Sequence, residues 1–431
     1  MPLLTLTAAP AQDMWARRLV TVSNPTAQPV AQLVSLPLAD LRLPTGTRLE
    51  SLRLIEAARQ RRVEFDLDAE TKHLHWFVQT PAAGNRRYEV YGSADPDLLP
   101  VSPDGLPAPT VVVGRRDAGN VSHELAYRGP GPAITLVWQD NTPYNPDVTQ
   151  THPLPLTEAD DKWMAELWRR RIGVASLKVM GQELVAPHWP GFWQALSYYY
   201  NTRPYSLGRL DEVRLVHGSL TSSLTASGAA ENYAYGWGHG LKIRLRVQAM
   251  PVSRLRVEWT LTAENDLATV PETGRPARPQ GQVSLTGLNF LPQYILPVFD
   301  RALWHDEHGR LQHAEVGIGE DRTFLDARPG GPGWCALFST QTGVLLGLIP
   351  DQWGDGGVVR LAAYDDRDWP RNVLQMLVVG APATNWKASQ SHTWSYWLIG
   401  AQAHTQAEAV AAMSAAAASA GQGLRIEVRD R

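Results

Sequence analysis

The chain has 431 residues, of which 44% are hydrophobic and 19% are charged, and its formal net charge is −3. This composition excludes a largely disordered protein, and the small net charge gives no general attraction to nucleic acid or to an anionic membrane. The single cysteine, Cys335, excludes an internal disulfide framework and a cysteine-based zinc site. Because Cys335 lies in an apolar run, we expect a buried, inert thiol.

The length predicts two or three domains. The N-terminus lacks the basic start and apolar core of a signal peptide, and no run of about 18 apolar residues is present. We therefore expect a cytoplasmic protein that does not cross a membrane, or a secreted one if a leader has been removed. The 16 Trp outnumber the 7 Phe, which favours rings with a polar handle at half-hydrated surfaces.

Residues 16–93 show the period-two alternation of half-buried antiparallel strands. The alternating apolar positions include Val63, Phe65, Leu67, Leu74, Trp76 and Val78. We predict a small β-sandwich over 1–95. Five prolines between 96 and 109 mark a boundary, so a linker is expected at 96–114 and the second domain at 115–431.

The second domain is predicted to be strands almost throughout, with two helices. A cap pattern at Thr157 starts the first helix, which is expected to end near Arg170, and an Ala-rich segment at 406–418 forms the second. The clearest hairpin lies at 241–261, where apolar and polar residues alternate on both sides of a turn. Since strands dominate without βαβ alternation, we predict an all-β protein built of antiparallel sandwiches with two peripheral helices.

Two ring-rich stretches, 186–205 and 231–240, mix aromatic rings with His, Arg, Asn or Glu. Rings beside hydrogen-bonding groups suit a sugar, whose C–H face stacks on the ring while its hydroxyls need polar partners. The alternative is that these rings belong to the core. The candidates for stacking are Trp189, Trp193 and Trp237.

The polar positions of the 241–261 hairpin are strongly basic. They hold Lys242, Arg244, Arg246, Arg254 and Arg256 against the single acidic residue Glu258. Like charges across a strand pair are destabilising. This face therefore predicts either an anionic ligand such as a uronate or sulfate group, or neutralisation by acidic residues of neighbouring strands.

Three segments of the chain resemble the β-supersandwich domain shared by galactose mutarotases and the sandwich modules of many polysaccharide lyases and glycosidases. They are 171–179 with 181–185, then 213–220, and then 255–265. The resemblance implies a large β-supersandwich over 115–431 and a carbohydrate ligand. The acid and base residues of the mutarotases do not map onto this sequence, so the resemblance carries over the fold and the ligand class only.

Elimination beside a uronate needs a group that neutralises the carboxylate, a base and an acid, and Tyr, His and Arg fill these roles without a cofactor. The proton-transfer candidates are Tyr199, Tyr205, Tyr235 and His239, and the carboxylate-binding candidates are Arg203 and Arg244. Hydrolysis would instead need two carboxyl groups about 5–10 Å apart. The sequence offers carboxyl groups that it cannot pair: Glu231, Asp300, Asp306, Glu307, Asp351, Asp355 and Asp365.

We predict no metal site, because the acidic loops at 351–355 and 365–368 lack the spacing of a calcium loop, and the histidines within 304–313 fit a surface turn. The predicted function is a carbohydrate-active enzyme that acts on an acidic poly- or oligosaccharide by β-elimination. Its expected partner is carbohydrate, with no cofactor, nucleic acid or membrane. A glycoside hydrolase and a non-catalytic glycan-binding or structural module stay open, as does the oligomeric state.

Overall fold

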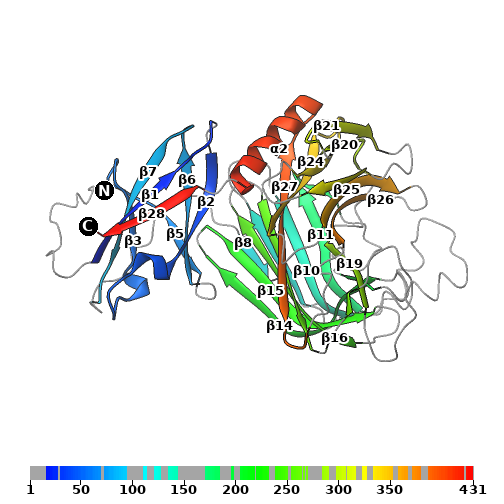
Figure 1. The fold of residues 1–431 in the computed structure, drawn as a ribbon, viewed down its shortest axis with the longest axis horizontal. Helices are drawn as coiled ribbons and strands as arrows, with labels where there is room; N and C mark the ends of the chain where they lie inside the picture. The colour runs from blue at the N-terminus through cyan, green and yellow to red at the C-terminus, as the bar shows by residue number, and fades with distance from the viewer. Residues whose placement is uncertain are drawn as a thin grey trace, which may run out of the picture. The chain divides into compact units, whose positions relative to one another are not determined.

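The chain forms two compact units, which Figure 1 shows in a computed structural model. Unit 1 comprises Met1–Ala108, Gly218–Thr221 and Gln422–Arg431, and unit 2 comprises Pro109–His217 and Ser222–Gly421. The structure describes residues 16–27, 30–68, 72–94, 110–113, 121–127, 134–143, 170–184, 196–198, 204–218, 220–232, 238–250, 254–264, 266, 268–269, 284–290, 298–306, 308–316, 323–327, 333–352, 358–366, 371–379, 387–421 and 424–430.

Unit 1 is a small antiparallel sandwich, as predicted for the N-terminal region. Its five-stranded sheet has the order β28 (Arg425–Asp430), β1 (Ala16–Ser23), β7 (Asn85–Gly92), β3 (Arg53–Glu56), β4 (Arg61–Arg62). Its three-stranded sheet has the order β2 (Val30–Pro37), β6 (His73–Thr80), β5 (Phe65–Asp68), and two short 3-10 helices lie at Leu38–Leu41 and Leu49–Ser51. The alternation in β6 buries Leu74, Trp76 and Val78 in the core of this unit.

The C-terminal strand belongs to unit 1, whereas the sequence placed it at the end of the 115–431 domain. β28 pairs antiparallel with β1, from Arg18 opposite Asp430 to Ser23 opposite Arg425. Strand alternation in the sequence does not reveal which edge a strand joins. The sequence-based boundaries and the two units therefore differ at this strand and at the insertion 218–221.

The insertion 218–221 is held inside unit 1 by a buried carboxylate. Asp66 Oδ2 accepts hydrogen bonds from the backbone N–H groups of Leu220 (2.8 Å) and Thr221 (2.6 Å) and from the Thr221 hydroxyl (3.0 Å). The Leu220 side chain is buried in the core of the unit. A Cβ at Gly218 would overlap the Asp66 carboxylate, so a larger residue here would displace the group that holds the insertion.

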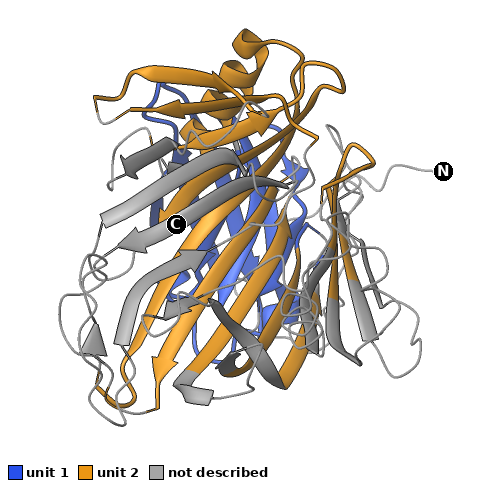
Figure 2. Ribbon diagram, turned by 90° about the vertical axis from the view of Figure 1, so that its right-hand side faces the viewer, with its two compact units in different colours: residues 1–108, 218–221, 422–431 blue, residues 109–217, 222–421 orange. Residues whose placement is uncertain are grey.

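Unit 2 is built on a strand-rich sheet, whose long neighbouring strands Figure 2 shows in orange. Among the described residues this sheet has 15 strands. Its order is β21 (Leu311–Glu315), β20 (Arg301–His305), β23 (Cys335–Phe338), β24 (Val344–Gln352), β27 (Ser391–Gln402), β17 (Arg254–Ala263), β16 (Gly238–Met250), β15 (Ser222–Asn232), β14 (Pro204–His217), β13 (Leu196–Tyr198), β19 (Ser284–Phe290), β26 (Arg371–Val379), β25 (Val358–Asp366) and β22 (Thr323–Ala327), with β18 (Ala268–Thr269) on β19. In β13, β19, β22, β25 and β26 the structure describes the backbone alone.

A second sheet of five strands completes the sandwich of unit 2. Its order is β12 (Gln182–Glu183), β11 (Arg170–Val179), β10 (Ile134–Pro143), β9 (Val121–Tyr127), β8 (Thr110–Val113). A two-residue turn joins β11 to β12, and its residues Met180 and Gly181 have φ of 54° and 81°, as such a hairpin requires. The two sheets share one apolar core, which includes Leu136, Trp138, Leu177, Leu245, Val257 and Trp259.

Several tryptophans lie in the core rather than at half-hydrated surfaces, contrary to the expectation from their number. Among the described residues, the fully buried Trp side chains are Trp76, Trp138, Trp259, Trp334 and Trp394. Their burial shows that a high Trp count does not separate core rings from surface rings. The expectation for Cys335 is confirmed, because its side chain is buried and this burial raises the pKa of the thiol.

The predicted C-terminal helix is confirmed as α2 (Gln406–Gly421). Its N-terminus forms a capping box, in which the Thr405 hydroxyl accepts from Glu408 N–H (3.2 Å) and the Glu408 carboxylate accepts from Thr405 N–H (3.2 Å). Met413 packs over β24, where a Cβ at Gly347 would overlap its sulfur. Among the described residues no helix is long and apolar enough to cross a membrane.

The other predicted helix was expected to run from Thr157 to about Arg170. Residues 157–169 lie outside the described part of the chain, and Arg170 is the first residue of β11. The predicted all-β class holds, with antiparallel sandwiches in both units.

Candidate functional site

The strands that flank parts of the two aromatic stretches are neighbours in the large sheet, in the order β13-β14-β15-β16. Tyr205, near the start of β14, lies opposite Asn232 at the end of β15. Glu231, also at the end of β15, lies opposite Gly238 at the start of β16. Both the β13–β14 connection and the β15–β16 connection therefore leave the sheet at the same end.

The predicted site residues differ in how much of them the structure describes. Arg244 lies in β16, opposite Ser227 and Thr260, and its side chain is half-buried and has an interaction partner. For Tyr205 in β14 and His239 in β16 the structure describes the backbone only. The residues outside the described part are Tyr199, Tyr235, Trp189, Trp193, Arg203 and Trp237. Their roles remain predictions.

A polar face lies on the side of the large sheet opposite the sandwich core. In β17, Leu255, Val257 and Trp259 enter the core, so strand alternation puts Arg254, Arg256 and Glu258 on the other side. The strand register adds the cross-strand neighbours of these residues. We define the polar face as Ser223, Thr225, Ser227, Lys242, Arg244, Arg246, Gln248, Arg254, Arg256, Glu258, Thr260, Thr393 and Ser395.

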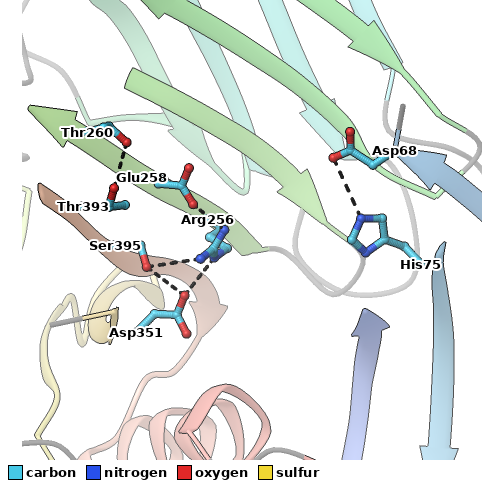
Figure 3. A network of polar contacts seen from close by, with 8 residues as sticks. All are labelled: Asp68, His75, Arg256, Glu258, Thr260, Asp351, Thr393 and Ser395. Atoms are coloured by element: carbon cyan, nitrogen blue, oxygen red, sulfur yellow. Dashed lines mark hydrogen bonds and ion pairs between the residues drawn. The ribbon is translucent and has the colours of Figure 1, made fainter. Parts of the chain in front are cut away.

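Arg256 is the centre of a hydrogen-bonded cluster on the polar face, which Figure 3 shows from close by. Its guanidinium donates to Asp351 Oδ2 (2.8 Å), to Glu258 Oε2 (2.9 Å) and to Ser395 Oγ (3.3 Å). The Ser395 hydroxyl in turn donates to Asp351 Oδ2 (2.9 Å). Beside this cluster, Thr260 and Thr393 lie opposite each other and share a hydrogen bond of 3.0 Å.

The cluster is partly hydrated, because the Arg256, Glu258 and Asp351 side chains are 22%, 18% and 23% exposed. Burial alone would lower the pKa of Arg256, but the nearby carboxylates of Asp351 and Glu258 raise it overall. The sequence left open whether a ligand or acidic residues of neighbouring strands neutralise the basic face. At Arg256 acidic residues do so. Lys242 is likewise paired, with Glu264 at 3.4 Å.

The contribution of β27 and Asp351 to this face was not predicted from the sequence. The signal was present in β27, where Ser391, Thr393 and Ser395 alternate with the buried residues His392 and Trp394. That alternation predicts a polar side of the strand, but not that β27 lies next to β17. Pairing between residues more than 130 positions apart comes from the tertiary structure alone.

Two other carboxyl groups considered for hydrolysis have structural roles. Asp300 accepts hydrogen bonds from the backbone N–H (3.0 Å) and the hydroxyl (2.5 Å) of Thr340. Asp306 closes the β20–β21 turn by accepting from the backbone N–H groups of His308 (2.9 Å) and Arg310 (2.8 Å), which confirms the predicted surface turn. Desolvation works against ionisation of Asp306, but these hydrogen bonds lower its pKa overall.

No group of three or more His, Cys, Asp or Glu side chains suited to a metal ion occurs among the described residues. The remaining carboxyl candidates are not described at the level of side chains: Glu231, Glu307, Asp355 and Asp365. The polar face and the adjoining Asp351 therefore offer guanidinium groups, two carboxylates and several hydroxyls. Such groups can hydrogen-bond sugar hydroxyls and can hold an anionic substituent.

The fold places the chain among antiparallel β-sandwich proteins. No protein-family model and no curated protein sequence matches it. One similar solved structure is galactose 1-epimerase from Lactobacillus acidophilus (9% identity, TM-score 0.36). The match covers 70% of this chain and 100% of the epimerase. Others are the GH36 alpha-galactosidase AgaA from Geobacillus stearothermophilus (11% identity, TM-score 0.35) and the heparan sulfate lyase HepC from Pedobacter heparinus (10% identity, TM-score 0.29).

The match to the galactosidase covers 65% of this chain but 41% of the galactosidase, and the match to the lyase covers 72% and 39%. The chain therefore spans less than half of either enzyme. An epimerase, a glycosidase and a polysaccharide lyase are the classes of protein that the sequence was found to resemble.

Proposed function

We propose that this protein is a carbohydrate-active enzyme that acts on an acidic, uronate-containing poly- or oligosaccharide by β-elimination. One observation carries the proposal. A basic polar face extends along the neighbouring strands β16 and β17. The β13–β14 and β15–β16 connections, which contain aromatic candidates, leave the sheet at one end of the neighbouring strands β13 to β16. A long face with charged and hydroxyl groups suits an extended anionic saccharide better than a small neutral sugar.

In the proposed reaction a base removes the C5 proton of the uronate, the electron pair forms a double bond to C4, and the bond from C4 to the glycosidic oxygen breaks. An acid protonates that oxygen, so the reaction consumes neither water nor a cofactor. The proton-transfer roles fall to Tyr199, Tyr205, Tyr235 and His239, with Arg203 at the carboxylate, and stacking falls to Trp189, Trp193 and Trp237.

Arg244 has a separate place in this proposal. It lies five residues from His239 along β16, which corresponds to roughly 17 Å between the two Cα atoms at the rise of a β-strand. That separation spans several sugar units, so Arg244 would bind the carboxylate of a unit further along the saccharide than the one that reacts beside His239. The polar face would then bind the saccharide over several units.

A glycoside hydrolase is the second candidate, because the polar cluster contains two carboxylates, Glu258 and Asp351, on one guanidinium. Hydrolysis needs an acid and a base of this type. The same arrangement in a non-catalytic module would bind the glycan without turnover.

The test is a panel of uronate-containing, sulfated and neutral glycans, followed by ultraviolet absorbance and by a reducing-end assay. New absorbance from the conjugated double bond supports elimination, and reducing ends without absorbance support hydrolysis. Binding without a product indicates a binding module, and no binding to any acidic glycan refutes the proposal. Tyr235→Phe and His239→Ala should each lower turnover at least tenfold, whereas Tyr91→Phe, a matched change in unit 1, should not.

A further inference from the structure

Arg254 is the first residue of β17 and lies at the far end of the polar face from the aromatic stretches. It lies opposite Met250 in β16 and opposite Ile399 in β27. Both neighbours are buried apolar residues, with Met250 6% and Ile399 4% exposed. Met250 is twelve residues from Gly238 in the same strand, so Arg254 lies roughly 40 Å along the sheet from the start of β16.

The Arg254 residue is largely buried, and it has no countercharge among the described residues. The residue is 9% exposed, yet among the described residues it has no hydrogen bond and no ion pair, although a guanidinium carries five N–H donors. Buried charges in folded proteins are normally paired, and an unpaired one indicates a missing partner. Desolvation lowers the pKa of Arg254 to about 10, so it stays protonated at neutral pH.

The acidic residues nearest along the polar face are already engaged. Glu258 and Asp351 both bind Arg256, two residues further along β17. Arg254, Arg256, Glu258 and Asp351 together carry two positive and two negative formal charges, but both carboxylates are bound to Arg256. The arrangement leaves Arg254 as an uncompensated cation on this part of the face.

We propose that Arg254 is an anion-binding residue whose ligand is an oxyanion, either the carboxylate or the sulfate group of an acidic saccharide or the free inorganic anion. The planar guanidinium matches the two oxygens of such a group, and the buried surroundings strengthen the interaction. Its cross-strand neighbours Met250 and Ile399 are apolar and buried, so neither supplies a countercharge. This site is distinct from the aromatic end of the sheet and does not depend on the elimination reaction.

The test is thermal unfolding of the full chain in sodium sulfate, compared with sodium chloride at equal ionic strength. Wild type should show a saturable rise in Tm with sulfate. Arg254→Met should abolish that rise, and Arg254→Lys, which keeps the charge but not the planar fork, should weaken it. Lys178→Met, which removes one exposed positive charge from β11 of the same unit, should leave the rise unchanged.

A second arm replaces sulfate by glucuronate, with glucose as the neutral control. A rise in Tm with glucuronate that requires Arg254 assigns the site to an acidic saccharide, and a rise with sulfate alone assigns it to an inorganic anion. An equal rise in wild type and Arg254→Met, or no rise in wild type, overturns the proposal. Arg254→Met should have a Tm at least equal to wild type without anion, because it removes an unpaired buried charge; a lower Tm there would indicate an intramolecular partner and also overturns it.

Discussion

Asp351→Asn removes one of the two carboxylates that bind Arg256 but keeps the size of the side chain. Asp351 and Arg256 are 23% and 22% exposed, so their ion pair is neither fully buried nor on the open surface. Exposed pairs couple by about 0.2–1 kcal/mol, and breaking a fully buried pair costs about 3–5 kcal/mol. Because Glu258 still binds Arg256 in the variant, we expect a coupling energy of about 1–2 kcal/mol between Asp351 and Arg256.

The assay is a double-mutant cycle with Asp351→Asn, Arg256→Met and the double variant, read from the free energy of unfolding in denaturant. Tryptophan fluorescence reports mainly on unit 2, because 14 of the 16 Trp lie in that unit. The control is the pair formed by Lys387 and Asp266, which has a similar N–O distance of 2.9 Å but is 69% and 62% exposed. Its coupling should be weaker than that of the Asp351–Arg256 pair and should fall with salt. Equal coupling in the two pairs would refute our account of the polar face as partly buried.

Three further predictions concern the packing and titration of the two units. Met413→Ala should destabilise unit 2 by about 2–4 kcal/mol, because the side chain is fully buried between α2 and β24; chemical denaturation measures this, and a loss below about 1 kcal/mol contradicts it. Gly218→Ala should lower the Tm of unit 1 because its Cβ would displace the Asp66 carboxylate, whereas Gly46→Ala, with open space around its Cβ, tests backbone strain alone. Burial raises the pKa of Tyr88 from 10.0 to about 12, so its contribution to stability is complete below pH 10 and is lost as pH rises toward 12. Spectrophotometric titration of wild type and Tyr88→Phe should differ by a phenol that titrates near pH 12.

Local patterns in the sequence were enough to predict the strand-rich fold. The alternation in β6 and in β17 separates buried from polar positions correctly, and the capping pattern before α2 locates its start. The sequence-based predictions were wrong where one local pattern is compatible with two tertiary arrangements. A strand such as β28 alternates in the same way at the end of either unit, and Trp is equally compatible with a core and with a surface site.

The candidate site was likewise predictable from the sequence only in part. The sequence identified the basic hairpin and left open whether acidic neighbours or a ligand compensate its charge. In β17 the structure shows one compensated and one uncompensated arginine. Arg256 is paired with Glu258 and Asp351, whereas Arg254 has no partner among the described residues. The difference depends on Asp351, which lies 95 positions from Arg256 in the chain.

The sequence by itself determined the all-β class, the alternation that gives each strand an apolar and a polar side, and the basic character of the β16–β17 hairpin. Only the tertiary structure decided that β27 borders this hairpin, that Asp351 reaches Arg256, and that the last strand closes unit 1. The physical reason is that alternation follows from the geometry of one strand, whereas strand order and charge compensation depend on which distant strands bury their apolar sides together.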